Sequence, residues 1–223
     1  MILCVRCDKM VLSQIETELS TALFFILSFS LAYMLTTKYT QTKQGRFLFW
    51  ALGMWAFFIG DVLEFVFATG IYSVFLADIY LFAIAILPGL LAIGSMQYVK
   101  SGLVRRGYYI FNMLAAALLL YYLATENVGN MMVSYVVAGM PPMDVINAST
   151  IITVPATIVI VVAALLSYRR KKDIWLLSIV VGILGFAIAG SLYALNVAPL
   201  LLYYAEFVGL IFLWAGFYKS TYR

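Results

Sequence analysis

Residues 149–172 read STIITVPATIVIVVAALLSYRRKK, an apolar run that ends in four consecutive basic residues. The run from Ser149 to Tyr168 matches the ~20 residues that an α-helix needs to cross the hydrocarbon core of a bilayer. The basic residues after it mark the cytoplasmic side, because short cytoplasmic loops of membrane proteins are enriched in Lys and Arg. This stretch therefore predicts a membrane-spanning helix and the side of the membrane at which it ends.

The same alternation of long apolar runs and short polar breaks extends in both directions from this stretch. The chain is 65% hydrophobic and only 11% charged, whereas soluble domains carry about 25% charged residues. The pattern predicts an all-α fold, a polytopic integral membrane protein with a seven-transmembrane-helix bundle. The predicted spans are residues 20–36, 47–68, 71–98, 108–125, 149–168, 174–195 and 200–218, between an extracellular N-terminal segment (1–19) and a cytoplasmic tail (219–223).

The basic residues of the chain predict its orientation. Every Lys and Arg except Arg6 and Lys9 falls on one side of the seven predicted spans. These residues are Lys38, Lys43, Arg46, Lys100, Arg105, Arg106, Arg169, Arg170, Lys171, Lys172, Lys219 and Arg223. That side is expected to be cytoplasmic, so an odd number of spans places the N-terminus outside and the C-terminus in the cytoplasm of the cell membrane. Because the charges lie at helix ends, they do not suggest a nucleic-acid partner.

Several kinds of chemistry are excluded by composition. The chain contains no histidine, which haem sites with a histidine ligand, histidine-containing zinc hydrolase sites and Ser-His-Asp triads all need. Cys4 and Cys7 form a C-x-x-C pair, which can be half a zinc site or a redox pair, but no second half follows. We therefore expect no cofactor and no enzyme. An intramembrane enzyme that acts on lipid through a carboxylate-bound metal remains an alternative.

An internal repeat is suggested by matching positions in the first and last three spans. Ser20-Thr21 opens the first span as Ser149-Thr150 opens the fifth, and Ala77-Asp78 in the third corresponds to Ala205-Glu206 in the seventh. Both triplets would start outside, so the repeat would be parallel, in a 3+1+3 arrangement. Parallel repeats occur in transporters, whose substrate sites lie at the repeat interface. Chance similarity between apolar helices is the alternative.

The expected topology resembles that of PQ-loop sugar transporters and of microbial rhodopsins, which also have seven helices and an external N-terminus. The resemblance is confined to topology. The last span, Leu200 to Tyr218, has no lysine to bind retinal, and the chain contains no Pro-Gln pair. Membership of neither family is expected.

Four acidic residues, Asp61, Glu64, Asp78 and Glu206, fall inside predicted spans. An ionised side chain at the centre of a bilayer costs about 2.5–3.5 kcal/mol on insertion scales, so such residues suggest a functional site. A rise of about 1.5 Å per residue places all four in the outer half, where no span offers a Lys or Arg to neutralise them. They are expected to bind a proton or a cation such as Na⁺, Ca²⁺, Mg²⁺ or Mn²⁺. Alternatively, they are solvated, or hydrogen-bonded as structural residues to side chains at similar depth: Tyr72, Tyr80, Tyr193, Asn196 and Tyr203.

The leading hypothesis is a small transporter or channel-like protein that binds or moves a cation, a proton or a small solute through this acidic cluster. Because the loops are too short to hold a soluble domain, the alternative is a non-transporting sensor or anchor subunit of a larger membrane complex. Homo-oligomers remain open, and the lipid bilayer is the expected surrounding. The loop of residues 126–148 holds Met131, Met132, Met140 and Met143. These methionines suggest an apolar lid over the bundle or, alternatively, a Cu(I) site.

Overall fold

The computed structural model describes residues 14–99, 101–133, 136–137, 139–172, 174–194 and 199–221. Within these residues the fold is all-α apart from one short hairpin, which confirms the all-α part of the predicted fold class. The helices are α1 (Gln14–Thr42), α2 (Gly45–Ala68), α3 (Val74–Ser95), α4 (Gly102–Thr125), α5 (Met143–Lys171), α6 (Trp175–Ala194) and α7 (Pro199–Thr221), and a 3-10 turn, η2 (Met96–Tyr98), follows α3. The C-x-x-C pair at Cys4 and Cys7 lies outside the described residues.

Short polar residues set the starts of two helices. The hydroxyl groups of Ser73 and Ser101 accept hydrogen bonds from the amides of Leu76 and Val104, at 3.2 and 3.4 Å. Such N-caps satisfy amides that have no partner inside the helix. Gly70, with φ +88°, makes the turn between α2 and α3, a conformation open to glycine because it has no Cβ. As a result α3 begins at Val74, whereas the predicted span starts at residue 71.

Five of the helices are long and apolar enough to cross a membrane. The five segments are Ser20–Thr42, Gly45–Ala68, Val74–Tyr98, Gly102–Thr125 and Met143–Arg169. In α6 the apolar segment found among the described residues is shorter, Leu177–Phe186. The chain is therefore a multi-pass membrane protein by the hydropathy of its helices. That α6 and α7 also cross the membrane, which would give seven spans, stays a prediction.

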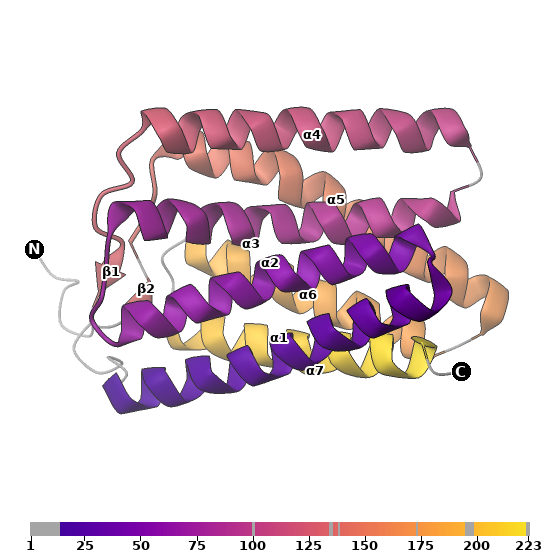
Figure 1. Cartoon of the computed structure of the whole chain (residues 1–223), viewed down its shortest axis with the longest axis horizontal. Coiled ribbons are helices and arrows are strands. Elements are labelled where there is room, and N and C mark those ends of the chain that lie inside the picture. The colour runs from indigo at the N-terminus through magenta and orange to yellow at the C-terminus, as the bar shows by residue number, and fades with distance from the viewer. Residues whose placement is uncertain are drawn as a thin grey trace, which may run out of the picture.

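The helices form an up-and-down bundle (Figure 1). Six of them make a closed series of contacts in the order α1, α2, α3, α5, α6, α7 and back to α1, while α4 packs on α5 and α3 at the edge of the bundle. Contacts of α3 with α5 and of α7 with α1 thus join the first triplet of helices, α1 to α3, to the second triplet, α5 to α7. This order agrees with a parallel 3+1+3 repeat, but the repeat itself stays a prediction.

The two ends of the bundle differ in charge. We call one of them the basic end. It contains the connections from α1 to α2, from α3 to α4 and from α5 to α6, together with the C-terminal end of α7 (Figure 1). The described basic residues of that end are Lys38, Lys43, Arg46, Arg105, Arg106, Arg169, Lys172 and Lys219. The other, which we call the hairpin end, carries strands β1 (Met132–Val133) and β2 (Val136–Val137).

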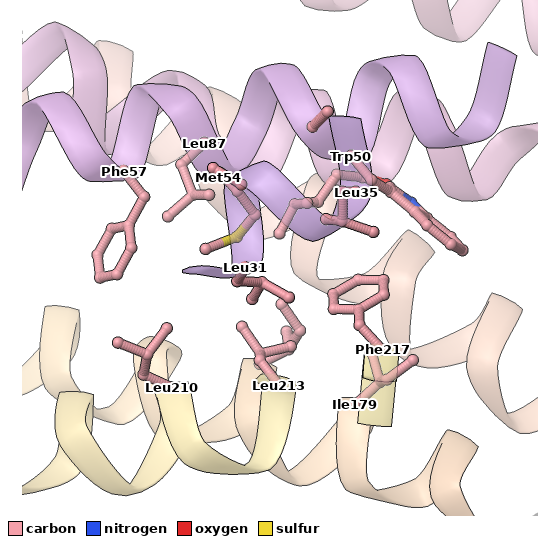
Figure 2. Packing of buried hydrophobic residues seen from close by; sticks show 14 of the residues in the cluster. Leu31, Leu35, Trp50, Met54, Phe57, Leu87, Ile179, Leu210, Leu213 and Phe217 are labelled. Carbon is pink, nitrogen blue, oxygen red and sulfur yellow. The ribbon is translucent and has the colours of Figure 1, made fainter. Parts of the chain in front are cut away.

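Two clusters of buried apolar side chains hold the bundle together. The larger lies inside the series of six helices, where Leu31 of α1 and Met54 of α2 face Leu210 and Leu213 of α7 (Figure 2). The smaller lies toward the hairpin end, between α2, α3, α4 and α5, and includes Met131 of the connection from α4 to α5. The two clusters share α2 and α3, so these helices are fixed on both sides.

Helices α6 and α7 approach each other most closely at glycines. A Cβ atom at Gly182 would lie 2.7 Å from the carbonyl oxygen of Gly209, and one at Gly209 would lie 2.9 Å from the carbonyl oxygen of Gly182. Gly185 also faces this contact, with its ideal Cβ position 3.0 Å from the Cα of Gly209. In a bilayer, helices associate through such close packing because lipid removes most of the hydrophobic driving force between them.

Candidate functional site: a buried carboxyl cluster

Asp61 and Glu64 lie on one face of α2, because residues three apart in a helix are neighbours on its surface. Their side chains are only 4% and 6% exposed. Asp61 lies about 10 Å of helix from Ala68, the last residue of α2, and so is well inside the bundle at the hairpin end. Both acids are therefore buried among the helices and do not face the surrounding lipid.

Asp61 is hydrogen-bonded to α1. Its carboxyl group hydrogen-bonds to Ser28 of α1, and the Ser28 hydroxyl also donates to the carbonyl oxygen of Phe25 at 3.2 Å. Among the described residues, the enclosed Oδ2 atom of Asp61 has no hydrogen-bond partner. Buried polar atoms are nearly always paired, so an unpaired carboxyl oxygen calls for an explanation.

Glu64 is paired with Tyr80 of α3, whose hydroxyl group donates a hydrogen bond to Glu64 Oε1. Tyr80 is 7% exposed, and its ring meets the ring of Phe67 edge-on at 5.9 Å. Phe67 in turn packs against Tyr72, with ring centroids 5.4 Å apart. These rings close the site toward the hairpin end.

Glu206 of α7 is the third member of the cluster. It is half-buried, and it interacts electrostatically with both Glu64 and Asp61. It lies about 10 Å of helix from Pro199, the first residue of α7, which matches the distance of Asp61 from the end of α2. We call Asp61, Glu64 and Glu206 the carboxyl cluster. It joins α2 of the first triplet to α7 of the second.

Asp78 stands apart from the carboxyl cluster. Among the described residues no hydrogen bond or charge interaction links it to the other three acids, although its Oδ1 atom is buried without a partner. Because α3 starts at Val74, Asp78 lies about 6 Å along the helix from its first residue. The structure thus brings three of the four predicted residues together.

The carboxyl cluster has no basic neighbour among the described residues. Arg46, the basic residue of α2, lies about 22 Å of helix from Asp61, toward the basic end. A search of the described residues for three acidic or cysteine side chains placed to hold a metal ion finds none. The cluster can accept protons and hydrogen bonds through its carboxyl oxygens.

The connection between α4 and α5 covers the hairpin end beside the cluster. The Tyr72 hydroxyl donates to the carbonyl oxygen of Gly129 at 2.5 Å and accepts from the Met131 amide at 3.1 Å. Met131 is 1% exposed and belongs to the smaller apolar cluster, whereas Met140 and Met143 are 52% and 69% exposed. This burial favours the interpretation of the methionine-rich loop as an apolar cover.

Ser28 was not singled out from the sequence, although a signal for it exists. Thr21 and Ser28 are seven residues apart in an otherwise apolar helix, and both are fully buried. Polar residues at that spacing share one helix face. Of the residues predicted to hydrogen-bond to the acids, Tyr80 contacts Glu64, whereas Tyr72 contacts the connection between α4 and α5. The side chains of Tyr193, Asn196 and Tyr203 lie outside the described residues.

The chain was compared with protein-family models, curated proteins and solved structures. None of the three comparisons finds a significant match.

Proposed function

We propose that this protein is a small membrane transporter or channel-like protein that binds and moves a proton through Asp61, Glu64 and Glu206. The observation that carries the proposal is the Asp61 carboxyl group, which is 4% exposed, has an unpaired Oδ2 atom and interacts with Glu64. An ionised group in such a place, without a cation beside it, is strongly unfavourable. A proton bound to the cluster removes that penalty.

Ser28 ties Asp61 to α1. The Ser28 hydroxyl lies 3.2 Å from the carbonyl oxygen of Phe25, to which it can donate, and it also hydrogen-bonds to the Asp61 carboxyl group. A serine hydroxyl has one proton and can donate it to one of these oxygens at a time. A change in the protonation of Asp61 would therefore change which oxygen the hydroxyl donates to, which links the protonation state of α2 to a contact with α1.

The arrangement of the carboxyl oxygens supports binding of a proton more than binding of a metal ion. The carboxyl cluster offers oxygens from two helices, but no three of the described acidic side chains converge as metal ligands do. In the orientation predicted from the basic residues, the cluster would lie in the outer half of the membrane, with the basic end in the cytoplasm. A proton would then enter from outside, on a path that the predicted repeat places between the two triplets. The proposal assigns no catalytic reaction to the chain.

Proton flux into liposomes tests the proposal. The purified protein is reconstituted with a pH-sensitive dye inside the vesicles, and flux is measured after an imposed pH step. The wild-type protein should acidify the vesicles, and Asp61→Asn and Glu206→Gln should abolish that flux. Glu126→Gln is the matched control because Glu126 is an exposed acid at the hairpin end, outside the cluster.

Two checks keep the result interpretable. Each variant must elute as the same monodisperse species as the wild type and unfold at a similar temperature, so that lost flux does not reflect lost structure. Undiminished flux in the Asp61→Asn/Glu206→Gln double variant, or no flux in the wild type under either direction of the gradient, would contradict the proposal. In the second case a sensor or anchor role, with its binding partner in a larger complex, becomes the better hypothesis.

A further inference from the structure

A pocket lies between the two helix triplets at the basic end, away from the carboxyl cluster. Its lining comes from α2, α3, α5, α6 and α7 and includes Trp50, Leu91, Ala163, Ile179 and Phe217. The space among these side chains, counted together with the open mouth of the pocket, is about 410 Å³. Trp50 lies about 16 Å of helix from Asp61, so this site is separate from the proposed proton site.

The walls of the pocket are almost entirely apolar. The polar groups of Trp50 and Ser95 are already used within the protein, since Trp50 Nε1 donates to the carbonyl oxygen of Leu91 at 3.0 Å and Ser95 Oγ donates to the same oxygen at 2.9 Å. Trp50 also packs edge-on against Phe217, with ring centroids 4.9 Å apart. The interior therefore suits a hydrocarbon chain or another apolar group.

A cationic group that forms no ion pair with any described residue stands at the edge of this apolar space. Arg46 lies one turn from Trp50 on the same face of α2, and its NH1 atom donates to the hydroxyl of Tyr98, a pocket-lining residue, at 2.8 Å. The guanidinium carbon is held over the Phe47 ring at 4.7 Å and the Tyr98 ring at 5.3 Å from their centroids.

Two donors at this edge have no acceptor among the described residues. Arg46 Nε is enclosed and has no hydrogen-bond partner there, and the Tyr98 hydroxyl accepts from Arg46 NH1 but donates to no described residue. A fixed guanidinium with a free buried N–H is well suited to a carboxylate or phosphate, which it can bind through two parallel hydrogen bonds. An apolar chamber with such a group at its edge matches an amphiphile with an anionic head.

We propose that the pocket binds an acyl chain, and that the anionic head group of the same molecule accepts hydrogen bonds from Arg46 and Tyr98. The chain would lie between α3, α5 and α6, against Leu91, Ala163 and Ile179. A free fatty acid and an anionic phospholipid both carry this chemistry. The surrounding Lys and Arg residues of the basic end favour either over an uncharged lipid. The inference does not depend on proton transport.

Native mass spectrometry of the protein in a detergent micelle measures such binding directly, because bound molecules are counted by mass. The wild type is titrated with laurate, with phosphatidylglycerol and with uncharged dodecanol. Laurate or phosphatidylglycerol should add one molecule in a saturable way, more tightly than dodecanol. Saturable binding of phosphatidylglycerol alone identifies the membrane as the source of the ligand, and saturable binding of laurate alone identifies a free fatty acid.

Two variants and one control locate the site. Ala163→Phe fills the pocket and should weaken binding by about tenfold or more, equivalent to about 1.4 kcal/mol. Arg46→Gln should weaken binding of laurate and phosphatidylglycerol but leave dodecanol unchanged. Ala117→Phe is the control because Ala117 is exposed on α4, away from the pocket, and it should bind as the wild type does.

Three outcomes would overturn the inference. These are the absence of a saturable adduct with both anionic ligands, wild-type affinity in Ala163→Phe, and equal affinity of the wild type for laurate and dodecanol. If Ala163→Phe does not fold, Arg46→Gln alone decides, because Arg46 is only partly buried and is not one of the side chains that line the pocket. Wild-type affinity of Arg46→Gln for laurate then excludes the proposed head-group site.

Discussion

The Tyr80 hydroxyl on α3 donates a hydrogen bond to Glu64 Oε1 on α2, and both side chains are almost completely buried. This contact holds Glu64 next to Asp61, and the ring of Tyr80 itself packs edge-on against Phe67. It also joins α3, which contributes no acid to the carboxyl cluster, to the buried acids of α2.

Tyr80→Phe is expected to destabilise the protein while leaving the packing of the ring unchanged. Removing the hydroxyl leaves a buried carboxyl oxygen with one partner fewer, which typically costs about 1–3 kcal/mol. Thermal unfolding in detergent should show a lower midpoint for Tyr80→Phe than for Tyr33→Phe, because Tyr33 is 62% exposed on α1. In a double-mutant cycle with Glu64→Gln, the two losses should be less than additive. Full additivity would show that the Tyr80 hydroxyl acts on another group.

The glycines between α6 and α7 give a prediction about packing. Gly209→Ala places a Cβ 2.9 Å from the carbonyl oxygen of Gly182, so the two backbones must separate, at a cost of about 1–3 kcal/mol. The midpoint of thermal unfolding should fall. Gly107→Ala on α4 is the matched control because its Cβ would meet nothing within 4 Å. This control should be neutral or stabilising by up to about 1 kcal/mol, since Ala is the better helix former. Equal midpoints for the two variants would mean that α6 and α7 are not in close contact.

Periodicity and hydropathy predict the features that depend on one helix at a time. The run at residues 149–168 lies within α5, and the spacing of Asp61 and Glu64 puts both on one face of α2. Features that depend on which helices are neighbours do not follow from a single sequence. The interaction of Glu206 with Asp61 depends on how α7 packs in the bundle. How α3 packs likewise decides that Asp78 interacts with none of the other described acids.

The contact of Ser28 with Asp61 is another feature that the sequence does not predict, because it depends on which helices are neighbours. A buried serine in an apolar helix is visible in the sequence, but serines in such helices commonly bond to their own backbone, as Ser28 does to Phe25. Only the placement of α1 against α2 gives this serine a second partner. The sequence therefore predicts that acidic residues form a buried cluster, but it does not predict which residues belong to that cluster.

Tyr72→Phe should loosen the connection between α4 and α5 with little effect on global stability. The Tyr72 hydroxyl bonds to the carbonyl oxygen of Gly129 and the amide of Met131, and its loss leaves that segment with fewer contacts to the helix bundle. Hydrogen exchange should speed up at Met131, whose amide loses its acceptor, and remain unchanged in the centre of α2. Tyr121→Phe, at a tyrosine 61% exposed on α4, should exchange as the wild type does. Unchanged protection of Met131 in Tyr72→Phe would show that apolar burial alone holds the connection in place.

The orientation of the bundle is the remaining prediction, and it decides from which side the carboxyl cluster is reached. The basic end should face the cytoplasm, because short loops rich in Lys and Arg are retained there. Single cysteines can be placed at Asn127, exposed at the hairpin end, and at Lys172, exposed at the basic end, in a Cys4→Ser/Cys7→Ser background. A maleimide that cannot cross the membrane should label Asn127→Cys in intact cells and Lys172→Cys only after lysis. The opposite labelling pattern would place the carboxyl cluster in the cytoplasmic half, and the proton would then be taken up from the cytoplasm.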